Sequence, residues 1–212
     1  MQQLAQSPGA DTSREGFLLR LRRLMADRRG VGAIEFAIVA PLLIMTYIGA
    51  FEITVGITAA RKISRASSNV SDLLTRNDTV DTTMLNAMKE VTRSVVAPFP
   101  QEYYSLTMTG ITVDAAGKAT VAWSYAWKRE KPADPKAQPT ELSSKPYTAG
   151  DVVDLPDDVE AKGSFIVRTE FEMKHHILLM APNLSSQLNE ITLGKTSFFR
   201  QRKGEKITCS GC

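Results

Sequence analysis

The longest apolar stretch of the chain lies close to its N-terminus. Between Val31 and Ile57 the only charged residues are Glu35 and Glu52. As a helix, the segment from Phe36 to Ile57 would be roughly 33 Å long, which is enough to cross a bilayer core of about 30 Å. A helix on the surface of a soluble protein keeps a polar face, and this segment has none. The pattern therefore predicts a single transmembrane helix from Phe36 to Ile57.

Two residues inside the apolar stretch need a physical explanation. Pro41 has no backbone N–H, so the carbonyl of Ala37 loses its helical partner, and the sequence predicts a kink or a closely packed neighbouring helix there. Glu35 would place a carboxylate inside the apolar run, where an unpaired charge is strongly disfavoured. Chemistry alone leaves two interpretations of Glu35 open: its side chain extends to the cytoplasmic headgroups, or it pairs with a positive group.

Two further helical segments are expected after the apolar stretch. Residues 58–75 contain no Gly or Pro and are predicted to continue the membrane helix outward as a stalk, and Asn77 and Asp78 are the stop signal that follows it. Residues 82–96 repeat apolar side chains at helical spacing, with Asp81 as the N-cap and prolines beyond the end. This second helix should pack its apolar face on a core.

Alternating apolar positions predict four β-strands in the rest of the chain. They are expected at 104–113, 119–127, 165–173 and 193–200. Residues 114–117 form a hairpin signal between the first two strands. Gly110 interrupts the alternation in the first strand, which indicates a β-bulge.

The remaining pattern completes the expected fold class. The aromatic stripe Trp123, Tyr125 and Trp127 is expected to lie in the core, with an exposed sugar- or partner-binding ladder as the alternative. The segment from 129 to about 162 contains several prolines and is expected to be a polar loop. A long N-terminal helix, a second helix and a small antiparallel sheet make an α+β fold.

The charge of the chain is unevenly distributed. Residues 1–30 contain six arginines and three acidic residues, whereas residues 31–212 contain 20 basic and 20 acidic residues, so the net charge of +3 lies wholly in the N-terminal segment. Nucleic-acid-binding proteins concentrate Lys and Arg on the folded domain, so the neutral body argues against that class. Five arginines at 20–29 against three basic residues at 61–65 predict a cytoplasmic N-terminus. A cleaved secretory signal is the alternative, but its apolar core would be shorter.

The residues at the start of the apolar stretch resemble a known processing site. Residues 28–36 read RRGVGAIEF, and residues 37–43 continue as AIVAPLL. The first run is similar to the cleavage site of type IV-pilin-like precursors of the tight-adherence (Flp/Tad) system, where a prepilin peptidase cuts after a Gly. In that family Glu is the fifth residue of the mature chain and is followed by Phe or Tyr. The run 35–43, Pro41 included, resembles the signature of the TadE-like proteins.

The resemblance implies a role for each residue of this site. Gly30 would precede the cut, Val31 would become the new N-terminus, and Glu35 and Phe36 would be the fifth and sixth residues. Cleavage would create an amine on Val31, with which Glu35 of a neighbouring subunit could pair. Removing one member of such a pair in lipid should strongly destabilise assembly.

The resemblance also implies an organisation and a set of partners. A pilin-like chain would consist of a cytoplasmic basic leader (1–30), a transmembrane helix with its stalk (31–76), and an extracytoplasmic α+β domain (77–212). The implied location is the bacterial inner membrane, crossed once. The implied partners are the prepilin peptidase, other Tad pilus and pseudopilin subunits, the inner-membrane pilus platform and the lipid bilayer.

Few residues outside this segment could carry chemistry. His175 and His176 are adjacent, so in a strand they point to opposite faces and do not readily share a metal. Cys209 and Cys212 favour a local disulfide in an oxidising compartment, with free thiols or a bond to a partner as alternatives. We therefore expect no catalytic residue, metal, cofactor or small-molecule substrate.

Two classes of function follow from the sequence. The favoured one is a pseudopilin-like structural or assembly protein of a Tad (Flp) pilus, contributing to pilus biogenesis and surface adhesion without being an enzyme. The alternative is a signal-anchored periplasmic binding module, or a thiol protein that uses Cys209 and Cys212. The N-terminus of the mature chain distinguishes them, because only the first function requires a start at Val31.

Overall fold

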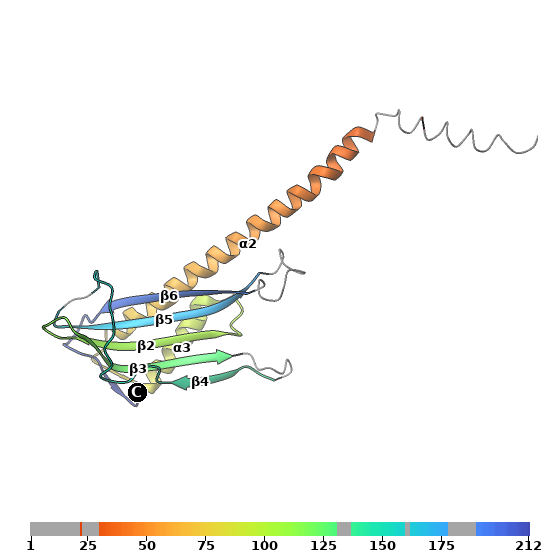
Figure 1. Cartoon of the computed structure of the whole chain (residues 1–212). Coiled ribbons are helices and arrows are strands. Elements are labelled where there is room, and N and C mark those ends of the chain that lie inside the picture. Colours follow the sequence, from red (N-terminus) through yellow and green to blue (C-terminus); the bar gives the residue numbers. More distant parts are fainter. Residues whose placement is uncertain (1–21, 23–29, 131–136, 160–161, 178–189) are drawn as a thin grey trace, which may run out of the picture. The chain divides into compact units, whose positions relative to one another are not determined.

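The computed structural model describes residue 22 and residues 30–130, 137–159, 162–177 and 190–212. The chain divides into two compact units, Met1–Ile48 and Gly49–Cys212. Helix α2 (Val31–Leu74) contributes its N-terminal residues to the first unit and its remaining residues to the second. The elements that follow, shown in Figure 1, are β1 (Thr79–Asp81), α3 (Thr82–Val96), β2 (Tyr104–Val113), β3 (Ala119–Glu130), β4 (Thr140–Ser144), β5 (Ser164–His176), β6 (Glu190–Arg200) and β7 (Thr208–Ser210).

The second unit is built on an antiparallel sheet of five strands. The strand order is β4-β3-β2-β5-β6, and every neighbouring pair is antiparallel. The short strands β1 and β7 form a separate parallel pair, with Val80 opposite Cys209. Two helices with an antiparallel sheet confirm the α+β prediction.

Local signals in the sequence account for the ends of both helices. Helix α3 has the predicted bounds, and the carboxylate of Asp81 accepts a hydrogen bond of 2.7 Å from the backbone N–H of Met84. Helix α2 ends at Leu74, one residue before the expected end of the stalk. Asn77 closes it, because its side-chain amide donates to the carbonyl of Leu73.

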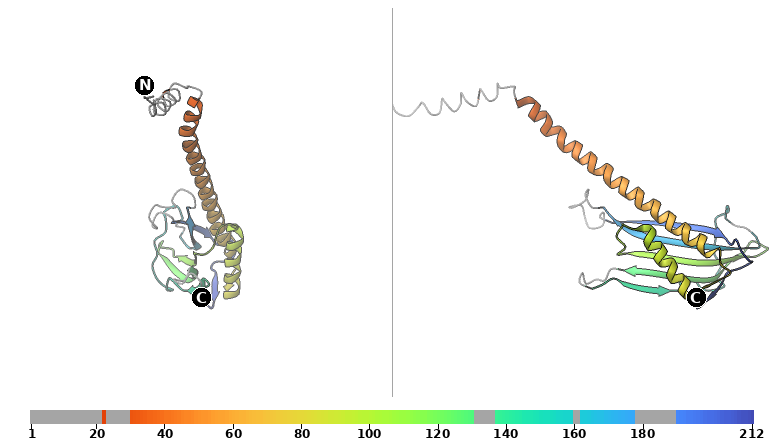
Figure 2. Two further views of the ribbon diagram at one scale, coloured as in Figure 1. Left: turned by 90° about the vertical axis from the view of Figure 1, so that its right-hand side faces the viewer. Right: turned by 180° about the vertical axis from the view of Figure 1, so that it is seen from behind.

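The main core lies between one face of the sheet and the two helices. Figure 2 shows α3 and the C-terminal part of α2 over the same face of the sheet. From Ala59 onward the buried residues of α2 recur at helical spacing and are mostly small, which allows a close approach to the strands: Ala59, Ile63, Ala66, Ser67, Val70, Ser71 and Leu74. Leu85 and Met88 of α3 join the same cluster. Trp123 and Tyr125 are buried and Trp127 is partly buried in it, so the aromatic stripe belongs to the core.

The irregularity at Gly110 marks a change of the buried face. Up to Gly110 the apolar residues of β2 face the helices, whereas Ile111 and Val113 join a second cluster with Ala119 and Ile166. Because successive strand residues point to opposite faces, this second cluster lies on the other face of the sheet. The register between β2 and β3 shifts between Gly110 and Ile111, so a bulge is present at the predicted level, but its extra residue belongs to β3 and not to β2.

Three strands were missed by the sequence pattern. The segment expected to be a polar loop contains β4, whose residues TELSS do not alternate between apolar and polar. It forms a strand because its backbone pairs with β3, which itself extends to Glu130. Strands β1 and β7 are three residues long each and pair with each other although they lie at opposite ends of the domain's sequence. A strand this short gives no periodic signal. The prediction of a loop throughout 129–162 was therefore wrong.

Candidate functional site: helix α2 and its anchorage

The N-terminal part of α2 exposes apolar side chains in the first unit. Phe36 is 71% exposed, and the other strongly exposed residues there are Val31, Ile34, Ile38, Val39, Leu42, Leu43, Ile44, Met45 and Tyr47. Such side chains are normally buried in a soluble protein. Among the described residues, α2 is the one helix long and apolar enough to cross a membrane, and none of its most apolar window is buried. The chain thus carries a candidate membrane span near its N-terminus.

Three threonines in this apolar stretch and just after it bond to the helix itself. The hydroxyl groups of Thr46, Thr54 and Thr58 each donate to the carbonyl four residues earlier, at 2.8 Å. In a bilayer these bonds remove the need for an outside partner. Pro41 lies inside α2, which continues on both sides of it, and the kink at Pro41 stays a prediction.

The residues of the predicted processing site lie together at the beginning of α2. Val31 is the first residue of the helix, and Gly30 immediately precedes it. Gly30 is exposed, and apart from its immediate neighbours no heavy atom of the described residues lies within 4 Å of the position that a Cβ would take there. Glu35 and Phe36 are exposed one turn further on. The peptide bond between Gly30 and Val31 therefore lies at the helix boundary, while its cleavage stays a prediction.

The C-terminal half of α2 is tied to the sheet by hydroxyl groups. The Ser67 hydroxyl donates to the carbonyl of Thr169 on β5 at 2.8 Å, and the Ser68 and Ser197 hydroxyl oxygens are 3.2 Å apart. Ser67 is fully buried, so its bond satisfies a polar group that burial would otherwise leave unpaired. These serines fix the stalk part of α2 against β5 and β6.

Lys62 joins α2 to the end of α3. Its amine donates to the carbonyl of Val95, at 3.4 Å, and to the carbonyl of Ala97. These carbonyls lie at the C-terminus of α3, where they have no helical partner and the helix dipole attracts a cation. The sequence showed Lys62 only as one of three basic residues after the apolar stretch, and nothing in its spacing identified this role.

A charged network on the helix-bearing face connects α3 to three strands. Glu141 of β4 accepts from Lys89 of α3 at 2.8 Å and from the hydroxyl of Tyr104 on β2 at 3.0 Å. The Lys89 amine also lies 4.5 Å from the centre of the Trp127 ring, within cation–π range. Burial acts to raise the pKa of Glu141, but the bonds from Lys89 and Tyr104 outweigh it, so this pKa is lowered. Burial, with the bond to Glu141, raises the pKa of Tyr104.

The C-terminal segment closes one side of the main core. Strand β7 pairs with β1, and Ile207 is buried against Trp123, whose indole N–H donates to the Ile207 carbonyl at 2.9 Å. Cys209 and Cys212 are joined by a disulfide and pack against the core cluster. The disulfide therefore lies at the edge of the main core, beside the strand pair of β1 and β7.

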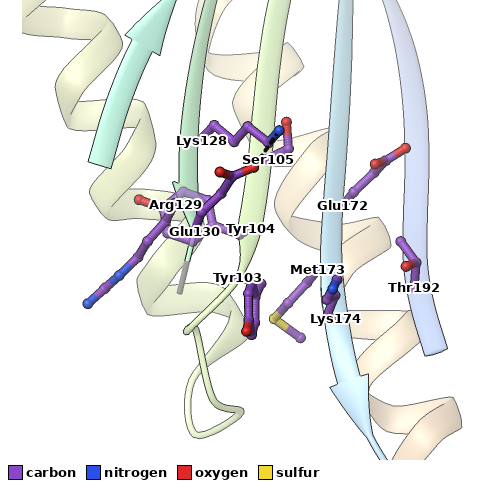
Figure 3. Close-up of a pocket in the computed structure, with 10 residues that line it drawn as sticks. All are labelled: Tyr103, Tyr104, Ser105, Lys128, Arg129, Glu130, Glu172, Met173, Lys174 and Thr192. Atoms are coloured by element: carbon purple, nitrogen blue, oxygen red, sulfur yellow. Dashed lines mark ion pairs between the residues drawn. The ribbon is translucent and has the colours of Figure 1, made fainter. Parts of the chain in front are cut away.

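The cavity drawn in Figure 3 lies at one end of the sheet. It measures about 320 Å³ and opens where β2 begins, with side chains from β2, β3, β5 and β6 around it. Both of its lysines are paired within the domain: Lys128 pairs with Glu130 at 2.6 Å, and Lys174 pairs with Glu190 at 3.1 Å. In the parts of the chain that the structure describes, no three His, Cys, Asp or Glu side chains gather as a metal site would require.

An apolar, exposed helix that begins directly after Gly30 and carries Glu35 and Pro41 is the feature to compare with known families. Residues 30–71 match the family of TadE-like proteins. This confirms the resemblance drawn from residues 28–43. The matched segment covers the apolar half of α2 and most of the stalk. No curated protein and no solved structure matches the chain.

Proposed function

We propose that this chain is a pseudopilin-like assembly component of a Tad (Flp) pilus that contributes to pilus biogenesis and surface adhesion. The observation that carries the proposal is the TadE-like match, which begins at Gly30 and contains the whole exposed apolar part of α2. In this proposal α2 crosses the inner membrane, residues 1–30 stay in the cytoplasm, and the α+β domain lies outside. A prepilin peptidase removes the leader after Gly30.

The position of Gly30 is consistent with a processing site there. A peptidase must bring the scissile bond against its own catalytic groups, and among the described residues no atom beyond the immediate neighbours of Gly30 lies within 4 Å of the position of a Cβ on this residue. The apolar residues that follow are exposed and can sit in the bilayer beside a membrane enzyme. Cleavage places the new amine at the first residue of α2.

Glu35 would then act in assembly. A carboxylate in hydrocarbon requires a positive partner, and the amine of Val31 on an adjacent processed subunit has the opposite charge. The pair would select subunits that have lost the leader, because an uncleaved chain has no amine at that depth. Removing the carboxylate would leave the amine uncompensated, which is more unfavourable than replacing both partners.

Processing can be tested on the full chain expressed with a prepilin peptidase. Intact-mass measurement should find a protein that begins at Val31. Gly30→Val should abolish this product because a branched side chain replaces the exposed Gly, whereas Gly32→Val, at a similarly open position in α2, should leave it. A chain that keeps Met1, or one cut equally well in both variants, would show that the leader is not processed at Gly30.

The pairing role of Glu35 needs a different comparison. Glu35→Gln and Glu52→Gln remove the two carboxylates of the apolar stretch with the same change in shape. Both variants should insert in the membrane, but only Glu35→Gln should reduce co-purification with other pilus subunits, by at least about tenfold if one buried pair is lost. Equal recovery of partners with both variants would refute the pairing.

The disulfide separates this proposal from the alternative of a thiol protein. If Cys209 and Cys212 served in redox chemistry, replacing both by Ser would abolish function in a stable protein. A structural disulfide predicts instead that function falls only in parallel with the amount of folded protein. Measuring both quantities in the same cells distinguishes the two roles.

A further inference from the structure

The cavity in Figure 3 lies on the face of the sheet that the two helices leave uncovered. The main core beneath the helices contains Trp127 of β3 and Met173 of β5. Because successive strand residues point to opposite faces, the residues beside them and on the neighbouring part of β2 point into the cavity: Ser105, Lys128, Glu172 and Lys174. In the sheet register, Ser105 lies directly between Lys128 and Glu172.

The cavity lies at the end of the sheet toward which α2 runs to reach its apolar part. The bond from Ser67 of α2 to the carbonyl of Thr169 fixes the helix beside the middle of β5. Nearer the N-terminus of α2, Lys62 bonds to the C-terminus of α3, and the ring of Phe99, just after α3, lies 6.1 Å from that of His175. The N-terminal direction of α2 and the C-terminal direction of β5 therefore lead to the same end of the domain.

Two lengths give the level of the cavity relative to the end of the predicted membrane span. From Thr169 to Lys174 the strand rises roughly 17 Å, and from Ser67 to Ile57, the last residue of the span, the helix rises about 15 Å. The inclination of α2 to the strands (Figure 2) shifts Lys174 only slightly toward the water side of Ile57. The headgroup layer extends about 5–7 Å beyond the hydrocarbon core. If α2 crosses the membrane, as the proposed function holds, the cavity lies at the level of the lipid headgroups.

The cavity presents groups of both charges, as a zwitterion requires. The ion pairs of Lys128 and Lys174 lie near the surface, where such pairs contribute little stability, so a phosphate group can compete for both amines. Glu172 is exposed and forms no ion pair with a described residue. The Cβ atoms of Lys128 and Glu172, on either side of Ser105, are roughly 10 Å apart. This separation leaves room for a short zwitterion between the ends of the two side chains.

We propose that this cavity binds the phosphoethanolamine headgroup of a phospholipid in the leaflet next to the domain. The phosphate accepts hydrogen bonds from the amines of Lys128 and Lys174, and the ammonium group donates to the carboxylate of Glu172. A choline headgroup has no N–H to donate and a glycerol headgroup has no positive charge, so Glu172 selects ethanolamine. Tyr103, whose ring centre lies 4.6 Å from the Lys174 amine, also lines the cavity, and tyrosine is favoured at membrane interfaces. The volume of about 320 Å³ falls within the range of small-ligand sites.

Lipid selectivity tests the chemistry of the cavity. The full chain in detergent micelles is titrated with phosphatidylethanolamine, phosphatidylcholine or phosphatidylglycerol, and bound lipid is measured by native mass spectrometry. Phosphatidylethanolamine should bind at least about tenfold more tightly than the others, since only it bonds to a charged carboxylate, and soluble phosphoethanolamine should displace it. Glu172→Gln should remove the preference. The matched control Glu205→Gln, at an exposed position outside the cavity, should keep it.

The level of the cavity is tested separately, in vesicles that contain phosphatidylethanolamine. A bimane label on Thr192→Cys, in the cavity, should be quenched by headgroup spin-labelled lipid, whereas a label on Ala116→Cys, in the exposed turn between β2 and β3, should not. The native cysteines are bonded to each other, and resistance to carbonate extraction reports insertion of α2. In an inserted chain, equal binding of the three lipids, an unchanged preference in Glu172→Gln, or no quenching at position 192 would overturn the headgroup site alone. Extraction by carbonate would overturn both this site and the membrane crossing.

Discussion

Gly110→Ala is expected to destabilise the α+β domain strongly, because the chain packs an aromatic ring over this residue. A Cβ at position 110 would lie 2.4 Å from Nε1 of Trp123 and 2.6 Å from Cζ of Phe165. Both rings belong to the buried core. Neither can move outward freely, so the added methyl group must displace the rings or the strand.

The size of the effect follows from two contributions. Overpacking of a core by one methyl group costs about 1–3 kcal/mol. Displacing Trp123 would also break the bond from its indole N–H to the Ile207 carbonyl, and a buried unpaired group adds about 1–3 kcal/mol. Backbone strain adds nothing, because Gly110 does not adopt a positive φ. We therefore expect a loss of about 4 kcal/mol, which lowers the Tm of a domain of this size by roughly 8–16 °C.

The assay is thermal unfolding of the full chain in detergent micelles, followed by near-UV circular dichroism of its two tryptophans. Gly194→Ala is the matched control, since Gly194 lies in the same sheet and its Cβ would meet only the flexible side chain of Glu172 at 3.1 Å and more distant atoms. Both variants make the same chemical change in a strand, so their difference isolates the clash with the rings. Tm values within about 3 °C of each other would refute this reasoning.

Three further predictions concern the groups that hold the domain together. Because the pKa of Glu141 is lower in the folded protein, the unfolded chain binds more protons in acid than the folded chain does. The stability that Glu141 contributes is therefore present above its ordinary pKa of 4.5 and is lost as the pH falls through the lower pKa of the folded state. Glu141→Gln should flatten this part of a plot of urea midpoint against pH, and an unchanged slope would contradict it. Lys62→Met should lower the free energy of unfolding by about 1–3 kcal/mol. The control Arg61→Met, at an exposed position, should change this free energy by less than about 0.5 kcal/mol. Equal effects of the two substitutions would exclude a specific role for the Lys62 amine. Reduction of the bond between Cys209 and Cys212 should raise the intact mass by about 2 Da and lower stability by about 2 kcal/mol, and a protein equally stable with and without reductant would show that β7 does not depend on the disulfide.

The parts of the fold that could be predicted are those fixed by neighbouring residues. Helix α3 was predicted with its bounds because Asp81 and the apolar spacing of 82–96 act within a few residues. The apolar stretch of α2 follows from composition alone. The role of Glu141 could not be predicted, because its partners Lys89 and Tyr104 are far away in the sequence and β4 has no alternating pattern of its own.

Gly110 shows why a local signal can be visible while its meaning depends on the rest of the fold. The interrupted alternation at Gly110 could be read from the sequence, but the apolar residues on its two sides serve different cores, on opposite faces of the sheet. The residue is small because Trp123 of the neighbouring strand occupies the space that a side chain would need. The extra residue of the bulge is Ala122 on β3, since Gly110 pairs with Trp123 and Ile111 with Val121. Because of the bulge, β3 places Trp123 on the helix-bearing face and Ala119 on the opposite face, in the second core. The sequence pattern of β2 could not reveal this change of face in β3.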